Sequence, residues 1–400
     1  MNVISELRAL GLDDNEAVLS VAAASEAGGR HRTGPRSFAL LKGGDTIASV
    51  ELNAKYAVKN FAVPEDLWPG VKKKISEAMS RTKAVVVRTT LLSHRELTSY
   101  ARVERWMQMR PLGYPVSDRT GLHMGPVRVP GGPPVPFSLE VFADVVDLPF
   151  LDAYRRIRAV DEATWLLSTF IATPIFRPRA PYAFAVLEDG IATVRCGTPG
   201  LEGELPDDRF ADVSAFPALC PVAYDKYYEE LGIASPEFEI PDVSALYSMY
   251  RYLPAVDRQR FLRACATVFE ASGPELGRIQ RLVALVGAIE PLLEEGKRCP
   301  KCGNHTGITE NFRAFVDTHV KPPDEIRKLY HDVYVARSEL AHGAWHYDVD
   351  EPTFGITLKS EPVSLAAWAI AKRGLVSWLR SRYCVYGVAQ HGAAPDRGGL

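Results

Sequence analysis

One arginine and one histidine near the end of a predicted helix carry the clearest chemical signal in this 400-residue chain. They form the pattern Arg337-Ser-Glu-Leu-Ala-His342, followed by Gly343. Histidine suits proton transfer near neutral pH because its unperturbed pKa is about 6.5. Arginine suits a phosphate group because its planar guanidinium binds two oxygens at once. The two side chains therefore favour cleavage of an RNA backbone, in which protons move and charge develops on the phosphate.

The positions of these two residues on the helix leave a structural role open as well. On a helix of about 100° per residue, Arg337 and His342 project about 140° apart, so they do not stack on one face. A cation at a helix C-terminus is favoured by the helix dipole, which would keep a proton on His342 for a leaving group. The same dipole makes Arg and His ordinary residues of a last turn. An apolar stripe beside Arg337 is predicted to face the core: Ile326, Leu329 or Tyr330, Val333 and Leu340.

A second motif has the residues of half a zinc site. In Cys299-Pro-Lys-Cys302-Gly, a tight turn would aim two thiolates at one metal ion. His305 extends the pattern, and His319 is a candidate fourth ligand. No second Cys-x-x-Cys pair follows, so the remaining ligands would come from elsewhere, including a second copy of the chain. The alternative is a reduced loop between helices. A structural zinc ion is thus the one cofactor predicted, and the Arg-His chemistry itself requires none.

Four more residues near the Arg-His motif are candidate RNA contacts. Arg327 and Lys328 would meet phosphates, Trp345 would stack on a base, and His346 would line the cleft. The alternative is a solvated helix face for the cations and ordinary loop packing for the others.

The composition restricts the class of protein. The chain is 46% hydrophobic and 24% charged, which is typical of a globular protein. With a net charge of −2, the chain as a whole does not attract nucleic acid electrostatically, so any contact with nucleic acid must be made by a local basic patch. We expect no membrane span and no signal peptide, because no apolar run approaches the ~20 residues that a span needs. Scattered cysteines predict reduced thiols and a cytoplasmic location.

The first 240 residues combine strand signals with few helices. The segment 26–35 is predicted to be an irregular connector, and the Pro/Gly-rich stretch 111–136 a long loop. Strands are expected at 37–41, 46–52, 84–92, 137–146, 182–187 and 191–196. One helix is expected at 151–170. The diglycine Gly43-Gly44 predicts a hairpin, because both residues accept positive φ. We interpret 1–240 as an α+β recognition or sensor domain, although no motif in it identifies a ligand.

From residue 241 the pattern becomes helical. Helices are expected at 243–271 with a break at Pro254, and at 275–295, 309–320, 324–342 and 361–383. Apolar residues at helical spacing in the last of these are predicted core: Leu365, Trp368, Leu375 and Trp378. The fold class is therefore α+β, with a strand-rich domain at 1–240, an all-α bundle at 241–386 and a flexible tail at 387–400.

The stretch Val333-Tyr-Val-Ala-Arg337-Ser338-Glu339-Leu-Ala-His342-Gly resembles the terminal helix motif of HEPN domains, particularly the ApeA-like group. The apolar helix Leu282–Leu293, with Glu290 before a Leu pair, is similar to another helix of that family, as is the segment 252–261. The resemblance covers about 245–385. It implies an all-α HEPN bundle that pairs into a homodimer.

The resemblance also implies a function. Many HEPN domains are metal-independent endoribonucleases of phage-defence or toxin systems, and some cut tRNA. If the roles known in HEPN domains apply to this chain, Arg337 would stabilise the phosphate and His342 would be the general acid or base. Ser338 would fill the polar position after the arginine, and Glu339 and Glu290 would orient Arg337. A phage or cellular trigger is then an expected partner. Other HEPN domains only bind, so a non-catalytic regulatory module is the alternative, and a zinc-stabilised interaction protein is the third.

Overall fold

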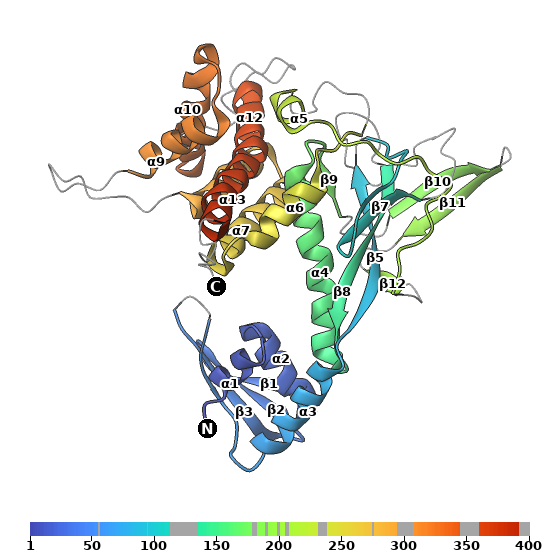
Figure 1. Cartoon of the computed structure of the whole chain (residues 1–400). Helices are drawn as coiled ribbons and strands as arrows, with labels where there is room; N and C mark the ends of the chain where they lie inside the picture. The colour runs from blue at the N-terminus through green and yellow to red at the C-terminus, as the bar shows by residue number, and fades with distance from the viewer. Residues whose placement is uncertain are drawn as a thin grey trace, which may run out of the picture. The chain divides into compact units, whose positions relative to one another are not determined.

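The computed structural model of the chain describes twelve segments, which carry all statements below: 1–54, 57–93, 95–112, 135–177, 182–188, 191–197, 201–204, 208–230, 238–273, 276–293, 307–344 and 360–391. The fold is α+β, with a strand-rich N-terminal region and a helical C-terminal part (Figure 1). No helix of these segments is both long and apolar enough to cross a membrane.

Contacts divide the chain into two compact units, each discontinuous in sequence. The first comprises Met1–Arg88, Glu140–Asp161 and Gly203–Ala211, and the second Thr89–Leu139, Glu162–Glu202 and Asp212–Leu400. The predicted boundary at residue 240 rests on composition and stays a prediction. Contacts instead group part of the strand-rich region with the helical C-terminal part.

The first unit holds a four-stranded antiparallel sheet of order β1-β2-β3-β4. Its strands are β1 (Gly29–Gly34), β2 (Ser37–Lys42), β3 (Asp45–Leu52) and β4 (Val58–Ala62). Its helices are α1 (Ile4–Ala9), α2 (Asp14–Ala24) and α3 (Trp68–Ser80). Helices and sheet share one apolar core, which includes Leu7, Val50, Phe61 and Ile75. The predicted hairpin is confirmed: Gly43 and Gly44 have φ of 61° and 97° between β2 and β3.

A six-stranded sheet has the order β12-β5-β8-β7-β6, with β9 paired to β5. Its strands are β5 (Lys83–Ser93), β6 (Ala101–Val103), β7 (Met107–Pro111), β8 (Val135–Val145), β9 (Ile175–Phe176) and β12 (Leu201–Glu204). Strands β10 (Tyr182–Glu188) and β11 (Ile191–Gly197) form the second predicted hairpin. The long helix α4 (Pro149–Phe170) follows β8, close to the bounds expected from its apolar spacing.

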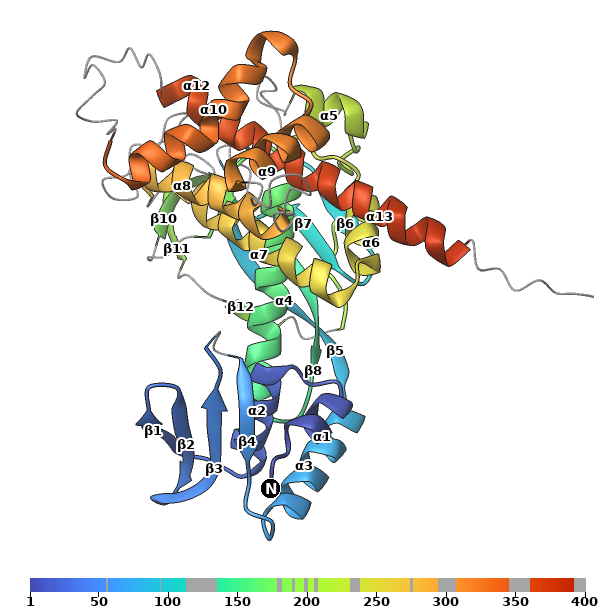
Figure 2. The same ribbon diagram turned by 90° about the vertical axis from the view of Figure 1, so that its left-hand side faces the viewer.

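The C-terminal part is helical, as predicted (Figure 2). Its α-helices are α5 (Tyr224–Glu230), α6 (Val243–Tyr252), α7 (Ala255–Ser272), α8 (Arg278–Ile289), α9 (Ile308–Phe315), α10 (Asp324–Ala341), α12 (Ser360–Ala369) and α13 (Leu375–His391). The 3-10 helix η1 (Glu290–Leu292) follows α8. Two π-helices, η2 (Val316–Val320) and η3 (Ile370–Gly374), continue α9 and α12 and contact each other. Helix α7 packs on α8, α10 on α8 and α12, and α13 on α6.

Several local predictions are confirmed because short-range chemistry decides them. Pro254 separates α6 from α7, since proline lacks the N–H that a continuous helix would use there. Gly343 follows the end of α10 with a φ of 72°, which only glycine adopts without strain. Helix α8 ends before its predicted bound, because Pro291 closes it through η1.

Other predictions were wrong. Segment 26–35 contains the strand β1, whose polar, mostly exposed residues pair with β2 through backbone hydrogen bonds and so show no apolar alternation. Helix α13 continues to His391, into the segment predicted to be a flexible tail. Leu365 and Ile326 are exposed rather than core; in α12 the smaller residues Ala366 and Ala367 are buried instead. The predicted loop 111–136 lies mostly outside the described residues.

Candidate functional site

The guanidinium of Arg337 is held by a carboxylate from another helix. Arg337 lies in the last turns of α10, and its Nη2 is 3.1 Å from Oε1 of Glu290, the residue that ends α8 and begins η1. The side chains of Arg337 and Glu290 remain 25% and 30% exposed. This contact joins one of the two predicted orienting carboxylates to the predicted phosphate-binding arginine, and solvent reaches both.

The ring of a buried tyrosine, Tyr334, lies under the same guanidinium. The Cζ atom of Arg337 lies 5.7 Å from the ring centroid of Tyr334, one turn earlier on α10. Tyr334 packs in turn against Phe312 of α9, with ring centroids 5.2 Å apart. Burial, and then the Glu290 carboxylate, raise the pKa of Tyr334, whereas Arg337 acts in the opposite direction. Arg337 is therefore held by Glu290 and Tyr334 together, and its Nε has no hydrogen bond with any described residue.

His342 is the C-terminal cap of α10 and is exposed. Its backbone N–H donates to the carbonyl of Ser338 at 3.0 Å, and its φ and ψ are −96° and 2°. Beyond it, the N–H of Ala344 donates to the carbonyl of Glu339 at 2.8 Å, across the positive φ of Gly343. This turn ends the helix and leaves the imidazole open to an incoming ligand. Ser338 and Glu339 are half-buried on the same turns.

The other predicted RNA contacts are only partly placed. Arg327 is exposed but bound by carboxylates: its Nη2 is 2.8 Å from Asp324 and its Nε 3.7 Å from Asp317. His331 Nε2 lies 2.9 Å from the same Asp317. Lys328 is exposed on α10. Trp345 and His346 lie outside the described residues.

The predicted zinc half-site also lies outside the described residues, because Cys299, Cys302 and His305 all fall between α8 and α9. Within the described segments, no group of three or more His, Cys, Asp or Glu side chains is arranged to hold a metal ion. His319 is half-buried in η2, with its ring centroid 4.8 Å from that of Phe315. Burial, followed by Arg382 and Lys321, lowers its pKa to about 4, so this imidazole is neutral at physiological pH.

The sequence reasoning missed a buried lysine in the helical part. Lys372 in η3 is 2% exposed, and its Nζ donates to the carbonyls of Ser168 and of Ile171, the latter at 2.9 Å. Ser168 lies in the last turn of α4, where the helix leaves its last acceptors without internal partners, and Ile171 directly follows the helix. Burial lowers the pKa of Lys372 to about 7. A charged residue inside the apolar run of the last helix was the available signal.

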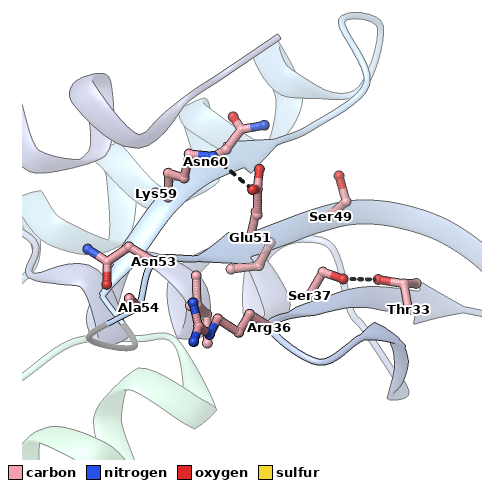
Figure 3. A pocket seen from close by; sticks show the side chains of 11 residues that line it. Thr33, Arg36, Ser37, Ser49, Glu51, Asn53, Ala54, Lys59 and Asn60 are labelled. Carbon is pink, nitrogen blue, oxygen red and sulfur yellow. Dashed lines mark hydrogen bonds and ion pairs between the residues drawn. The ribbon is translucent and has the colours of Figure 1, made fainter.

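The first unit carries a polar pocket that the sequence did not predict (Figure 3). Its volume is about 670 Å³, and it opens on the exposed face of the β1–β4 sheet. Hydroxyl, amide and charged side chains line it: Thr33, Arg36, Ser37, Ser49, Glu51, Asn53, Lys59 and Asn60. The Nζ of Lys59 lies 3.0 Å from Glu51, and the hydroxyl of Thr33 lies 3.0 Å from that of Ser37. Its lining contains no aromatic ring, so a bound base would find nothing to stack on.

The site around Arg337 offers a fixed cation and an accessible imidazole on the last turns of one helix. A guanidinium can bind an anion, and an imidazole can exchange a proton with one. Comparison with family models, with curated proteins and with solved structures finds no match for this chain.

Proposed function

We propose that this chain is a metal-independent endoribonuclease in which Arg337 and His342 act on the scissile phosphate. One observation carries the proposal: the Arg337 guanidinium is fixed by Glu290, 3.1 Å away, while the His342 imidazole, five residues later, is exposed. A pre-positioned cation stabilises developing phosphate charge without reorganising at the moment of reaction. The resemblance to HEPN domains supports the same assignment.

The reaction follows from the two groups. A neutral imidazole takes the proton of the 2′-hydroxyl, and the 2′-oxygen attacks the adjacent phosphorus. Arg337 stabilises the charge on the phosphate oxygens as the bond to the 5′-oxygen breaks. An imidazolium then gives its proton to that leaving oxygen. The products are a 2′,3′-cyclic phosphate and a 5′-hydroxyl.

A homodimer would supply both imidazoles. One His342 can be base or acid in a given step, and a symmetric pair places a second copy in the same cleft. Val335, which is 37% exposed beside the Arg337 turn, is a candidate residue for that interface. The dimer, tRNA as substrate and a role in phage defence or as a toxin are proposals that rest on the family resemblance.

The second candidate is a non-catalytic binding or regulatory module. The Glu290 carboxylate favours it, because an anion already on the guanidinium competes with a phosphate for the same donors. A structural zinc ion at Cys299 and Cys302 fits either candidate, since it would hold the fold and take no part in the reaction.

The chemistry of the fragment ends tests the proposal. Purified protein is incubated with total tRNA in EDTA, and the fragments are labelled at their 5′ ends by a polynucleotide kinase without prior phosphatase treatment. The proposal predicts fragments that label directly and that carry a 2′,3′-cyclic phosphate. Fragments with 5′-phosphates would exclude attack by the 2′-oxygen.

A further inference from the structure

The most exposed apolar side chains of the described residues gather in the helical part. Tyr252 is 61% exposed, Val256 63% and Val385 60%, more than any other large hydrophobic residue in those segments. Single exposed apolar residues are ordinary on protein surfaces, whereas a cluster of them marks a site of interaction. These three come from the end of α6, the start of α7 and the last turns of α13.

Two contacts bring these elements together. The ring of Tyr252 meets that of Tyr383 edge-on, with centroids 5.7 Å apart and an interplanar angle of 65°. The hydroxyl of Tyr386 lies 2.8 Å from Oδ2 of the buried Asp257. Both views of the ribbon place α6 beside α13 (Figures 1 and 2). We define the α6–α13 surface by five residues: Arg251, Tyr252, Val256, Arg260 and Tyr383.

The charge of this surface is positive. Arg251 precedes Tyr252, and Arg260 lies one turn after Val256 on the same face of α7; both arginines are exposed. Neither makes an ion pair with a described carboxylate, and Arg251 forms a side-chain hydrogen bond with Tyr247 of the same helix. The nearby Asp257 is buried and accepts a hydrogen bond from Tyr386, and its single negative charge offsets only one of the two arginines. Arg327 of α10 differs, because two carboxylates already bind it.

We propose that the α6–α13 surface binds single-stranded RNA, with bases stacked on Tyr252 and Tyr383 and phosphates on Arg251 and Arg260. The inference rests on the proposed function, for which this surface would hold the substrate away from the scissile bond. Aromatic rings beside arginines are the usual means of binding unpaired nucleotides. A second copy of the chain fits less well, because self-pairing of the surface would bring its like-charged arginines together.

The test uses the full chain carrying His342→Ala, so that bound RNA stays intact. The affinity for a labelled 20-nucleotide oligouridine is measured by fluorescence anisotropy, alongside a duplex of the same length. Since stacking contributes about 1–3 kcal/mol per base, Tyr252→Ala should raise Kd about tenfold, while Tyr252→Phe retains affinity. Arg260→Ala should reduce the slope of log affinity against log salt by about 0.7, the value expected for one lost phosphate contact.

Matched controls come from the other unit. Phe150→Ala and Arg30→Ala remove an exposed aromatic ring and an exposed arginine elsewhere, and should leave Kd unchanged. Thermal unfolding of each variant excludes a loss of folding. Unchanged affinity in both Tyr252→Ala and Arg260→Ala would overturn the proposal. So would a homodimer that dissociates in Tyr252→Ala while RNA affinity stays the same, since that result assigns the surface to a second copy.

A cysteine on α13 offers an independent readout. Cys384 is free and exposed between Tyr383 and Val385, and Cys220 is free and exposed outside the α6–α13 surface. Bound RNA should slow alkylation of Cys384 and leave that of Cys220 unchanged, as read by peptide mass spectrometry. Equal rates with and without RNA would contradict the proposal. Both measurements report RNA binding and need no cleavage. A protein that binds RNA here but does not cleave it would therefore contradict the proposed nuclease function and leave the proposed RNA-binding surface standing.

Discussion

The Glu290 carboxylate, at the junction of α8 and η1, lies 3.1 Å from the Arg337 guanidinium near the end of α10. The two residues are far apart in sequence, so this contact depends on the packing of α10 against α8. It fixes one end of Arg337, while Tyr334 lies under the guanidinium. The contact is open to two functions: it can orient the arginine toward a phosphate, or it can compete with one.

Replacing Glu290 separates these two functions. If Glu290 orients Arg337, Glu290→Ala should lower kcat for RNA cleavage about tenfold with a smaller change in KM, because a positioning contact acts mainly in the transition state. Glu290→Gln should recover part of the loss, since it restores a side-chain oxygen that can accept the Arg337 hydrogen bond. If cleavage instead rises and RNA affinity increases, the carboxylate is a competitor and the positioning role is wrong.

Arg337→Lys tests whether cleavage requires the planar guanidinium group or only a positive charge. Lysine keeps the positive charge but binds phosphate as a point charge, and it loses the bidentate geometry. We expect kcat to fall about a hundredfold, as for the loss of a preorganised donor, while the protein stays folded. Thermal unfolding checks the fold, and single-turnover kinetics measure the cleavage step. Wild-type kcat in Arg337→Lys would show that only charge is required at this position.

The buried His319 predicts a loss of stability in acid. Its pKa in the folded state, about 4, is below the unfolded value near 6.5, so between these values the unfolded chain binds more protons. The contribution of the buried His319 to the free energy of unfolding should therefore be fully present above about pH 6.5 and should be lost as the pH falls toward 4. His319→Gln should flatten this part of the curve of unfolding free energy against pH. Parallel curves for the two proteins would contradict the prediction.

Lys372 is predicted to stabilise the junction of η3 with α4. Lys372→Ala leaves the carbonyls of Ser168 and Ile171 without their donor inside the protein. Because a buried unpaired polar group costs about 1–3 kcal/mol, we expect the free energy of unfolding to fall by a few kcal/mol in chemical denaturation. The exposed Lys328→Ala is the matched control and should change it by less than about 0.5 kcal/mol. Equal effects would show that the bonds of Lys372 contribute nothing net.

Gly374 marks the close approach of the two π-helices. A Cβ atom there would lie 2.8 Å from Cε1 of Phe315 and 3.3 Å from Cγ2 of Val320, both of which are buried. Alanine is otherwise the better helix former by about 1 kcal/mol, so the two effects oppose each other. We expect the clash to dominate and Gly374→Ala to lower the free energy of unfolding by about 1–3 kcal/mol. A rise in stability would mean that Phe315 moves aside freely.

The parts of this fold that the sequence predicts are those decided within a few residues. Pro254 and Gly343 set helix boundaries through their own backbone chemistry. The diglycine at Gly43 sets a hairpin in the same way. Strand β1 was missed because its pairing uses backbone groups, which are the same in every sequence.

In the candidate site, too, the sequence predicts what local geometry decides and does not predict contacts that depend on tertiary packing. The Arg337 and His342 positions follow from local helix geometry, and Glu290 was a candidate only through the family resemblance. The ion pair itself depends on how α8 and α10 pack, which no local pattern specifies. Lys372 shows the limit most clearly, because its acceptors Ser168 and Ile171 lie some two hundred residues earlier in the chain. The polar pocket of the first unit is likewise assembled across strands.

The proposed roles of Arg337 and His342 in RNA cleavage are tested by incubating purified wild type, His342→Ala and Arg337→Ala with total tRNA in EDTA and reading the products on a denaturing gel. His342 is exposed at the end of α10, so its replacement should leave the fold intact. We expect discrete fragments from wild type and none from either variant, with equal thermal stability of wild type and His342→Ala. Fragments of equal intensity from wild type and His342→Ala would contradict it, because the imidazole would then have no part in the cleavage.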